Sequence, residues 1–485
     1  MQSLGIEISD AGIVACGFDG TEHALLPLEA HTLAMPGYAF IGERGMLLGE
    51  SAAAHLRLNP SRSTDRFWSE LSLQPADIKG LRRPLSYAHL AYRQLDRTWK
   101  RAQEAFPDVR SVAVGLSPTL LADGGETDER LGILLGIIRD LQIPLAGLVS
   151  LDVAQLNFEN HPDLERPGSL FALDVHQHET VLTRLSREAS ARSRVVARLP
   201  NCGFNQILDG LADRMAQRFL QETAYDVHDD PEDEQSFFLQ VRRLLFSGRL
   251  KPAREIRIDV SGNARHMHVP DDILESALAT WTDRLSELTS RTLTAEPGLK
   301  PGEPVTMLLS PRASGLRGLG VRIGRNSPRP VHVVRTEPGS AAAGAAQVAA
   351  RLKPSEDLEQ TPVITTWERP PAEGADRPES LETTFRSPTH VLFDAVAYPL
   401  KASGLLVGTS GEGGAPLPDN VRHAFDLPWS ARDLEVSPSH SRTIQVNGVE
   451  AKGPFTLRTG DRLTVSAGDR LYGLQIIHLA GTSPA

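Results

Sequence analysis

Apolar and polar residues alternate at the start of the chain, as they do in a half-buried strand pair. Residues 4–16 alternate around the turn formers Asp10, Ala11 and Gly12, which predicts an antiparallel β-hairpin. A second hairpin is expected at residues 38–48. Further apolar spacing predicts helices at 49–58, 85–106 and 128–140, with strands at 111–116 and 146–149. This alternation of strands and helices predicts a sheet covered by helices, and therefore an α/β fold.

The opening hairpin pattern returns later in the chain. An apolar run from Leu170 to Asp174 passes through a turn at His176 to His178 and continues to Leu185. Two halves that each begin with a hairpin predict an internal duplication. The elements expected after it are a helix at 203–222, an acidic loop at 226–234, a helix at 235–246, an inserted hairpin at 256–269, a helix at 270–293, a strand at 305–309 and a helix at 339–352.

The composition changes near residue 353. Residues 353–388 are rich in Pro, Glu, Thr and Arg and have little apolar periodicity, which predicts a linker. Residues 389–481 hold short alternating strands between Gly, Pro and Asp turns, as in a small β-sandwich. The expected organisation is a duplicated domain over 1–352, with a first lobe at about 1–168, a second lobe at about 169–352 and an inserted subdomain at about 225–300.

Charge and cysteine content exclude several function classes. The 485 residues carry a formal charge of −10 without a basic block, so nucleic acid is not an expected partner. No apolar stretch approaches the ~20 residues of a membrane-spanning helix, and no membrane partner is expected. The two cysteines, Cys16 and Cys202, lie far apart, and no leader pattern is visible. A cytoplasmic location and a core position for both thiols are therefore expected.

One segment of the first lobe resembles a known family. Residues 45–53, which read GMLLGESAA and lead to Asn59-Pro60, are similar to the "LVGEAA…NP" segment of the seventy-kilodalton heat-shock chaperones. Residues 148–154, 203–219 and 339–346 resemble further segments of the same ATPase domain, in the same order. The resemblance covers residues 1–352 and implies a duplicated two-lobe fold like that of actin and the sugar kinases. It also implies ATP or ADP with Mg²⁺ as ligand.

The resemblance assigns roles to individual residues. In this superfamily two turn backbones hold the phosphates, an acidic residue positions metal and water, and a later glycine pair lies against adenosine. The implied catalytic acids are Asp152 and Asp174. The implied nucleotide-binding residues are Glu7, Asp10 and Gly12 of the first hairpin, His176, His178 and Thr180 of the second, Gly203 at the start of the next helix, Ser310 and Arg312 of the adenosine motif, and Gly339 at the start of the last helix.

Both hairpins depart from the family pattern. Glu7 stands where an aspartate is expected, and His176, Gln177 and His178 stand where the family has glycines that let phosphate approach the backbone. The sequence therefore predicts a degenerate nucleotide site with weak or no ATPase activity, in a chaperone-family protein acting as a scaffold or regulatory module. The alternatives are an active ATP-dependent chaperone and, after it, a sugar-kinase-like phosphotransferase.

Two further patterns each allow two interpretations. His176 and His178 with Asp174 could bind a divalent metal, but a polar hairpin turn is the preferred interpretation, and no metal site is predicted. Phe67 and Trp68, together with apolar residues of 85–106, could form a partner surface, but their spacing is more typical of core positions.

The last domain resembles a second family. Residues 444–448 (IQVNG) followed by 457–465 (LRTGDRLTV) are similar to the final strands of forkhead-associated domains. That family binds phosphothreonine through Arg and Ser in earlier loops, whereas Gly408-Thr409-Ser410 lacks the arginine and residues 437–442 are only a loose counterpart. A protein partner or client bound through this β domain is therefore expected, and docking is the preferred interpretation over phosphothreonine recognition.

Overall fold

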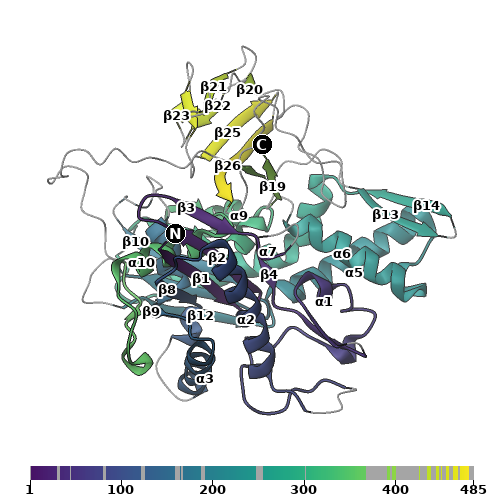
Figure 1. Ribbon diagram of the computed structural model, residues 1–485. Helices are drawn as coiled ribbons and strands as arrows, with labels where there is room; N and C mark the ends of the chain where they lie inside the picture. Colours follow the sequence, from purple (N-terminus) through teal and green to yellow (C-terminus); the bar gives the residue numbers. More distant parts are fainter. Residues whose placement is uncertain are drawn as a thin grey trace.

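The computed structural model is a mixed α/β protein in which several sheets are covered by helices (Figure 1). The described residues are 2–29, 33–43, 45–79, 84–121, 126–158, 164, 166, 168–186, 192–246, 255–260, 262–300 and 302–367, together with the strands named below between 390 and 479. The α/β class predicted from the sequence is confirmed. Within this part of the chain, no helix is long and apolar enough to cross a membrane.

The first sheet contains the predicted opening hairpin. Its strands are β1 (Ser3–Ser9), β2 (Gly12–Phe18), β3 (His23–Leu26), β8 (Ser111–Leu116) and β9 (Leu145–Ser150). Their order is β3-β2-β1-β8-β9, with β1 antiparallel to β2 and parallel to β8. Helices α2 (Tyr87–Ala105) and α3 (Glu126–Asp140) share a core with this sheet. Phe67 and Trp68 are buried in that core, which confirms the preferred interpretation of these aromatics.

The second sheet repeats this topology. Its strands are β10 (Ser169–Val175), β11 (Glu179–Leu185), β12 (Arg194–Pro200), β15 (Val305–Leu309) and β16 (Val331–Arg335). They follow the order β12-β11-β10-β15-β16, in which three antiparallel strands are again continued by two parallel ones. The middle strand of each sheet, β1 or β10, is therefore the first strand of a hairpin and ends at the hairpin turn.

Between β12 and β15 the chain forms a mostly helical unit, which lies to one side in Figure 1. It consists of α5 (Phe204–Thr223), α6 (Pro231–Phe246), the β13–β14 hairpin (Glu255–Val260 and Asn263–His268) and α7 (Asp271–Ala295). Helix α6 begins four residues earlier than expected. Pro231 fits the first helical position and the acidic residues that follow stabilise the positive end of the helix dipole, so part of the predicted loop is helical. Helices α8 (Pro311–Gly315) and α9 (Leu319–Asn326) follow β15.

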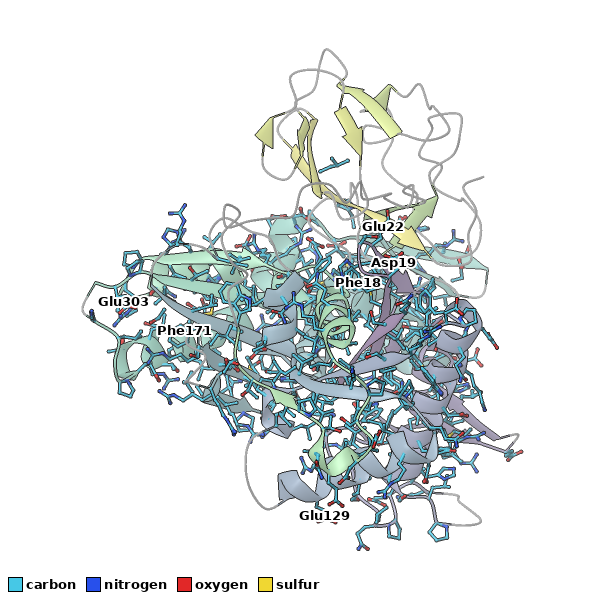
Figure 2. All side chains as sticks on the ribbon, turned by 60° about the vertical axis from the view of Figure 1, so that its left-hand side comes forward. Phe18, Asp19, Glu22, Glu129, Phe171 and Glu303 are labelled. Carbon is cyan, nitrogen blue, oxygen red and sulfur yellow. The ribbon has the colours of Figure 1, made fainter. Side chains whose placement is uncertain are left out.

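Two helices join the two sheets. Helix α4 (Leu151–Phe158) follows β9, and α10 (Ser340–Arg351), which is made mostly of small residues, follows β16. A Cβ added to Gly344 of α10 would lie 1.7 Å from the carbonyl oxygen of Ala154, and one added to Gly5 of β1 would lie 1.9 Å from that of Ala342. The backbones are thus in direct contact at these two positions, which only glycine permits. In Figure 2, Phe171 of β10 and Glu303, which precedes β15, are labelled to the left of Phe18 of β2 and the neighbouring Asp19.

A small sheet extends from the first sheet. It contains β5 (Ala39–Gly42), β6 (Gly45–Leu48) and β7 (Ser63–Thr64), in the order β6-β5-β7, and the predicted hairpin at 38–48 is confirmed. The helix expected at 49–58 is shorter: α1 spans only Glu50–Ala53 and continues in turns. Strand β4 (Met35–Pro36) pairs with β2.

The first part of the predicted linker is instead part of the packed fold. Strand β17 (Val363–Ile364) pairs with β9 of the first sheet, and Ser193 next to β12 donates its amide to the carbonyl oxygen of Thr365. Trp367 is buried. The segment up to Trp367 therefore contacts both sheets, and the remainder of the predicted linker lies outside the described residues.

The described residues between 390 and 479 form strands, as expected, and most of these strands are drawn in yellow in Figure 1. Its strands are β18 (His390–Phe393), β19 (Val396–Pro399), β20 (Phe425–Asp426), β21 (Leu434–Pro438), β22 (Ile444–Val446), β23 (Val449–Glu450), β24 (Phe455–Leu457), β25 (Arg462–Ala467) and β26 (Arg470–Leu479). The end of β26 pairs with β3, so the β region continues the first sheet rather than standing apart. Gly408-Thr409-Ser410, compared above with a phosphopeptide loop, lies outside the described residues.

Candidate functional site

The two hairpin turns predicted to hold phosphate contact each other directly. Asp10, in the β1–β2 turn, accepts the backbone N–H of Gln177 with both carboxylate oxygens at 2.8 Å, and the N–H of His178 with Oδ2 at 3.3 Å. Both donors belong to the β10–β11 turn. A carboxylate on backbone N–H groups forms charge-assisted hydrogen bonds, which are stronger than neutral ones. We call this arrangement the inter-turn contact.

The second turn is held in place by the start of α5. The amides of Phe204 and Asn205 donate to the carbonyl oxygens of His176 and Gln177, at 2.8 and 3.0 Å. Gly203 caps this helix, and a Cβ there would lie 2.4 Å from the carbonyl carbon of His178. The turn carbonyls therefore point toward α5, while the N–H groups of Gln177 and His178 are left to bind Asp10.

His176 lies buried between the two hairpins. Its Nδ1 is 3.7 Å from Oδ1 of Asp10, and its Nε2 is 3.6 Å from Oδ2 of Asp174 and 3.3 Å from Oγ of Ser117. The imidazole is thus surrounded by two carboxylates and a hydroxyl. Ser117 follows β8, so a residue of the first sheet contacts the second hairpin at this point as well.

Asp174 is the ionised carboxylate of this cluster. Burial alone would raise its pKa, but the nearby His176 and Arg312, with a hydrogen bond from Ser310, lower the pKa below its ordinary value. Arg312 lies 3.8 Å from Asp174 and donates its Nε–H to the carbonyl oxygen of Val175 at 2.5 Å. Ser310 and Arg312, expected in the adenosine region, therefore support Asp174 instead.

Two more carboxyl groups lie near Asp174 and are harder to ionise. Burial, helped by the negative charge of Asp174, raises the pKa of Asp152 from 3.8 to about 7, although a hydrogen bond from Thr183 opposes the shift. Burial also raises the pKa of Glu7 from 4.5 to about 7, against the attraction of Arg312. Glu7 keeps partial contact with solvent, whereas Asp152 has almost none. Three carboxyl groups in one buried cluster avoid carrying three charges at once.

A second layer of hydrogen bonds surrounds the inter-turn contact. The buried side chain of Gln177 donates to the hydroxyl of Tyr38 at 2.9 Å and to Oδ1 of Asn205 at 2.6 Å. His178 lies 3.5 Å from Asp65, which also accepts a hydrogen bond from Asn205. Burial raises the pKa of Asp65, while the charge of His178 opposes this shift. The first hairpin, the small sheet and α5 are thus connected through one turn.

The remaining predicted residues have structural contacts. Thr180 donates its hydroxyl to the carbonyl oxygen of Cys202 at 2.5 Å, and Gly12 adopts a φ of 132° in a place where a Cβ would touch Met35 and Pro36. Gly339 lies against Leu25 at the start of α10, and no described contact joins it to the carboxylate cluster. Cys16 and Cys202 are buried, as expected.

Sequence reasoning missed Ser117, Tyr38, Asp65 and Asn205. Each comes from an element distant in sequence from both turns, and none stands in a recognisable motif. Only Gln177 could have been found from the sequence, because it belongs to the turn that stands in place of the family's glycines.

No family model matches this sequence, and no curated protein sequence matches it either. Within the described residues, no group of three or more His, Cys, Asp or Glu side chains is arranged to hold a metal ion.

The arrangement does not fit a bound triphosphate. The N–H groups that would hold phosphate oxygens already bind the carboxylate of Asp10. Behind the turns the ionised Asp174 adds negative charge, which would repel a polyanion, whereas Glu7 and Asp152, with pKa values of about 7, carry only part of a charge at neutral pH. Chemically, the cluster can join the two hairpins and respond to pH.

Proposed function

We propose that this chain has a two-lobe fold of the actin and heat-shock-70 type whose former nucleotide cleft is closed by its own side chains, and that it acts as a scaffold or regulatory protein-binding module. Support for the fold comes from the strand order shared by the two sheets and from the helices α4 and α10 that join them. In this superfamily the cleft lies between the two lobes, where the two hairpin turns meet.

The inter-turn contact carries the functional proposal. A nucleotide must displace Asp10 from the amides of Gln177 and His178 before its phosphates can use them. Displacing a charge-assisted hydrogen bond costs about 1.5–3 kcal/mol, and the freed carboxylate would then repel the phosphates. Both alternatives named above, an active chaperone ATPase and a sugar-kinase-like enzyme, need this space for phosphate.

Calorimetric titration of the full chain with Mg-ATP and with Mg-ADP tests the proposal. We expect no binding at millimolar nucleotide and no release of phosphate. Metal-dependent binding accompanied by turnover would contradict the scaffold proposal and favour an active ATPase. The β strands between residues 390 and 479 are the proposed docking region for a protein partner, and deletion of residues 389–485 should then abolish partner capture without changing the nucleotide result.

A further inference from the structure

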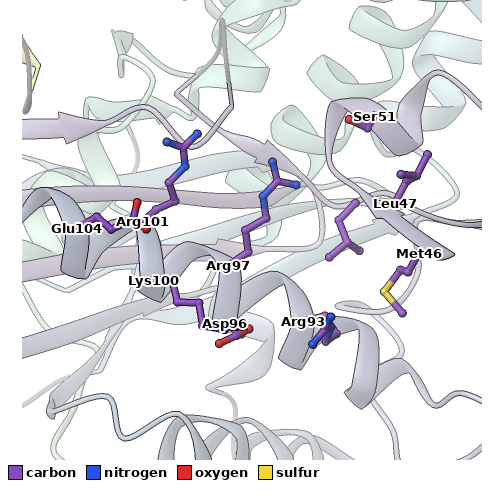
Figure 3. Close-up of a pocket in the computed structure, with 10 residues that line it drawn as sticks. Met46, Leu47, Ser51, Arg93, Asp96, Arg97, Lys100, Arg101 and Glu104 are labelled. Carbon is purple, nitrogen blue, oxygen red and sulfur yellow. Dashed lines mark hydrogen bonds and ion pairs between the residues drawn. The ribbon is translucent and has the colours of Figure 1, made fainter. Parts of the chain in front are cut away.

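The surface between β6 and α2 forms a groove of about 530 Å³ with two unlike walls. One wall is apolar and consists of Met46, Leu47 and Leu48 of β6. The other is the face of α2 and is charged. Figure 3 shows Met46 and Leu47 across the groove from the arginines of α2. The α2 residues that line it are Arg93, Asp96, Arg97, Lys100, Arg101 and Glu104.

The charge of this groove is opposite to that of the whole chain. Four cationic side chains and two carboxylates line it, whereas the chain has a formal charge of −10. Two of the cations are paired: Lys100 with Asp96 at 2.9 Å, and Arg97 with the buried Glu29 at 3.3 Å. Arg93 and Arg101 form no ion pair with another described residue and are exposed. The groove therefore attracts carboxylates at two positions two helical turns apart.

Among the described strands, the apolar wall also has an unpaired edge. Strand β6 is the last strand of its sheet, and β5 pairs with only one of its sides. Gly49 donates its amide to the carbonyl oxygen of Tyr38, so Leu47 and Gly49 bond toward β5. Alternate residues of an antiparallel strand bond in opposite directions, and the N–H and C=O groups of Met46 and Leu48 consequently face the other side. An extended peptide can pair with such an edge.

We propose that this groove binds an extended acidic segment of a partner protein, which adds to the edge of β6 and places its carboxylates against Arg93 and Arg101. Alternate side chains of a strand point to opposite sides, so the segment has acidic residues at every second position and apolar residues between them. Leu47, with 38% of its surface exposed, contacts these apolar residues. This proposal rests on the proposed scaffold function, because it names the kind of protein segment that the scaffold binds. It involves none of the residues of the inter-turn contact.

Fluorescence anisotropy with the full chain tests this proposal directly. The probe is a labelled ten-residue peptide of alternating Glu and Val, used at low ionic strength. We expect saturable binding that the double variant Arg93→Glu, Arg101→Glu weakens at least ten-fold. The matched control is Arg257→Glu, Arg291→Glu, which changes the net charge equally at exposed positions elsewhere and should leave the affinity unchanged.

The strand pairing needs a separate measurement, because charge alone could hold an acidic peptide. Methylating alternate backbone nitrogens of the probe removes the donors for β6 and should also weaken binding at least ten-fold, with no change to the protein.

No binding at millimolar probe, an equal loss in the control variant, or undiminished binding of the methylated probe would each overturn the proposal. Tighter binding of a short RNA duplex that is lost in the Arg93, Arg101 variant would overturn it in favour of nucleic acid. None of these outcomes depends on the nucleotide titration, so the two proposals fail separately.

Discussion

The two sheets have the same strand order, but their hairpin turns have opposite chemistry. The first turn is short and contributes a carboxylate, Asp10, whereas the second contributes backbone N–H groups and the side chains of His176 and Gln177. In an ATP-binding cleft of this topology both turns would face the same phosphates. Here the carboxylate of the first turn binds the amides of the second, so two halves with the same strand order are joined through turns of complementary chemistry.

The largest expected effect concerns the helices that hold the two halves together. Substituting Gly344→Ala places a Cβ 1.7 Å from the carbonyl oxygen of Ala154, so backbone must move. We expect the free energy of unfolding to fall by ~3 kcal/mol or more. Chemical denaturation followed by circular dichroism measures this change.

The control for this substitution is Gly136→Ala in α3. A Cβ at Gly136 meets nothing within 4 Å, so only helix propensity changes and the protein should become more stable by up to ~1 kcal/mol. A tolerated Gly344→Ala would mean that the two sheets are not joined through direct backbone contact.

The second largest effect is expected when the inter-turn contact is removed by substitution. Asp10→Ala leaves the amides of Gln177 and His178 without their acceptor, and we expect a loss of ~2 kcal/mol in the free energy of unfolding. The matched variant is Asp19→Ala. Asp19 likewise accepts turn amides, those of Thr21 and Glu22, but within its own exposed turn, so its loss should cost ~1 kcal/mol or less. Equal losses in the two variants would contradict a special role for Asp10.

The third effect is a dependence of stability on pH. Asp152 has a pKa of about 7 in the folded chain and ordinarily 3.8, so ionisation is costly only in the folded state. Its stabilising contribution is complete below about pH 4 and is lost as the pH rises through 7. Between pH 6 and pH 8 this one group should lower the free energy of unfolding by roughly 1 kcal/mol.

Two amide variants distinguish the contributing groups. Asp152→Asn should remove the part of the decrease in the free energy of unfolding between pH 6 and pH 8 that Asp152 causes. Glu7→Gln should remove a similar or smaller part, because the carboxyl group of Glu7 keeps some contact with solvent. Denaturant titrations at each pH provide the values. A wild-type chain whose stability does not fall across this range would show that neither group is uncharged at neutral pH.

The hairpins, the long helices and the repeated theme could be predicted because their hydrophobic periodicity is local. The short strand β17 and the helix α4 could not, since Val363 and Ile364 pair with a strand more than two hundred residues earlier and α4 has little periodicity of its own. The site residues Asp10, Asp174 and His176 were found through their turns. Their actual partners were not, because the hydrogen bonds of Asp10 depend on how two distant turns meet.

The most direct test of the central claim is amide hydrogen exchange at Gln177, measured by NMR in the wild type and in Asp10→Ala. If the carboxylate of Asp10 binds this N–H group, its exchange is slow in the wild type and fast in the variant, while amides of the β1–β8 pairing stay protected in both. Rapid exchange of the Gln177 amide in the wild type, at the rate of an exposed loop, would contradict the closed cleft.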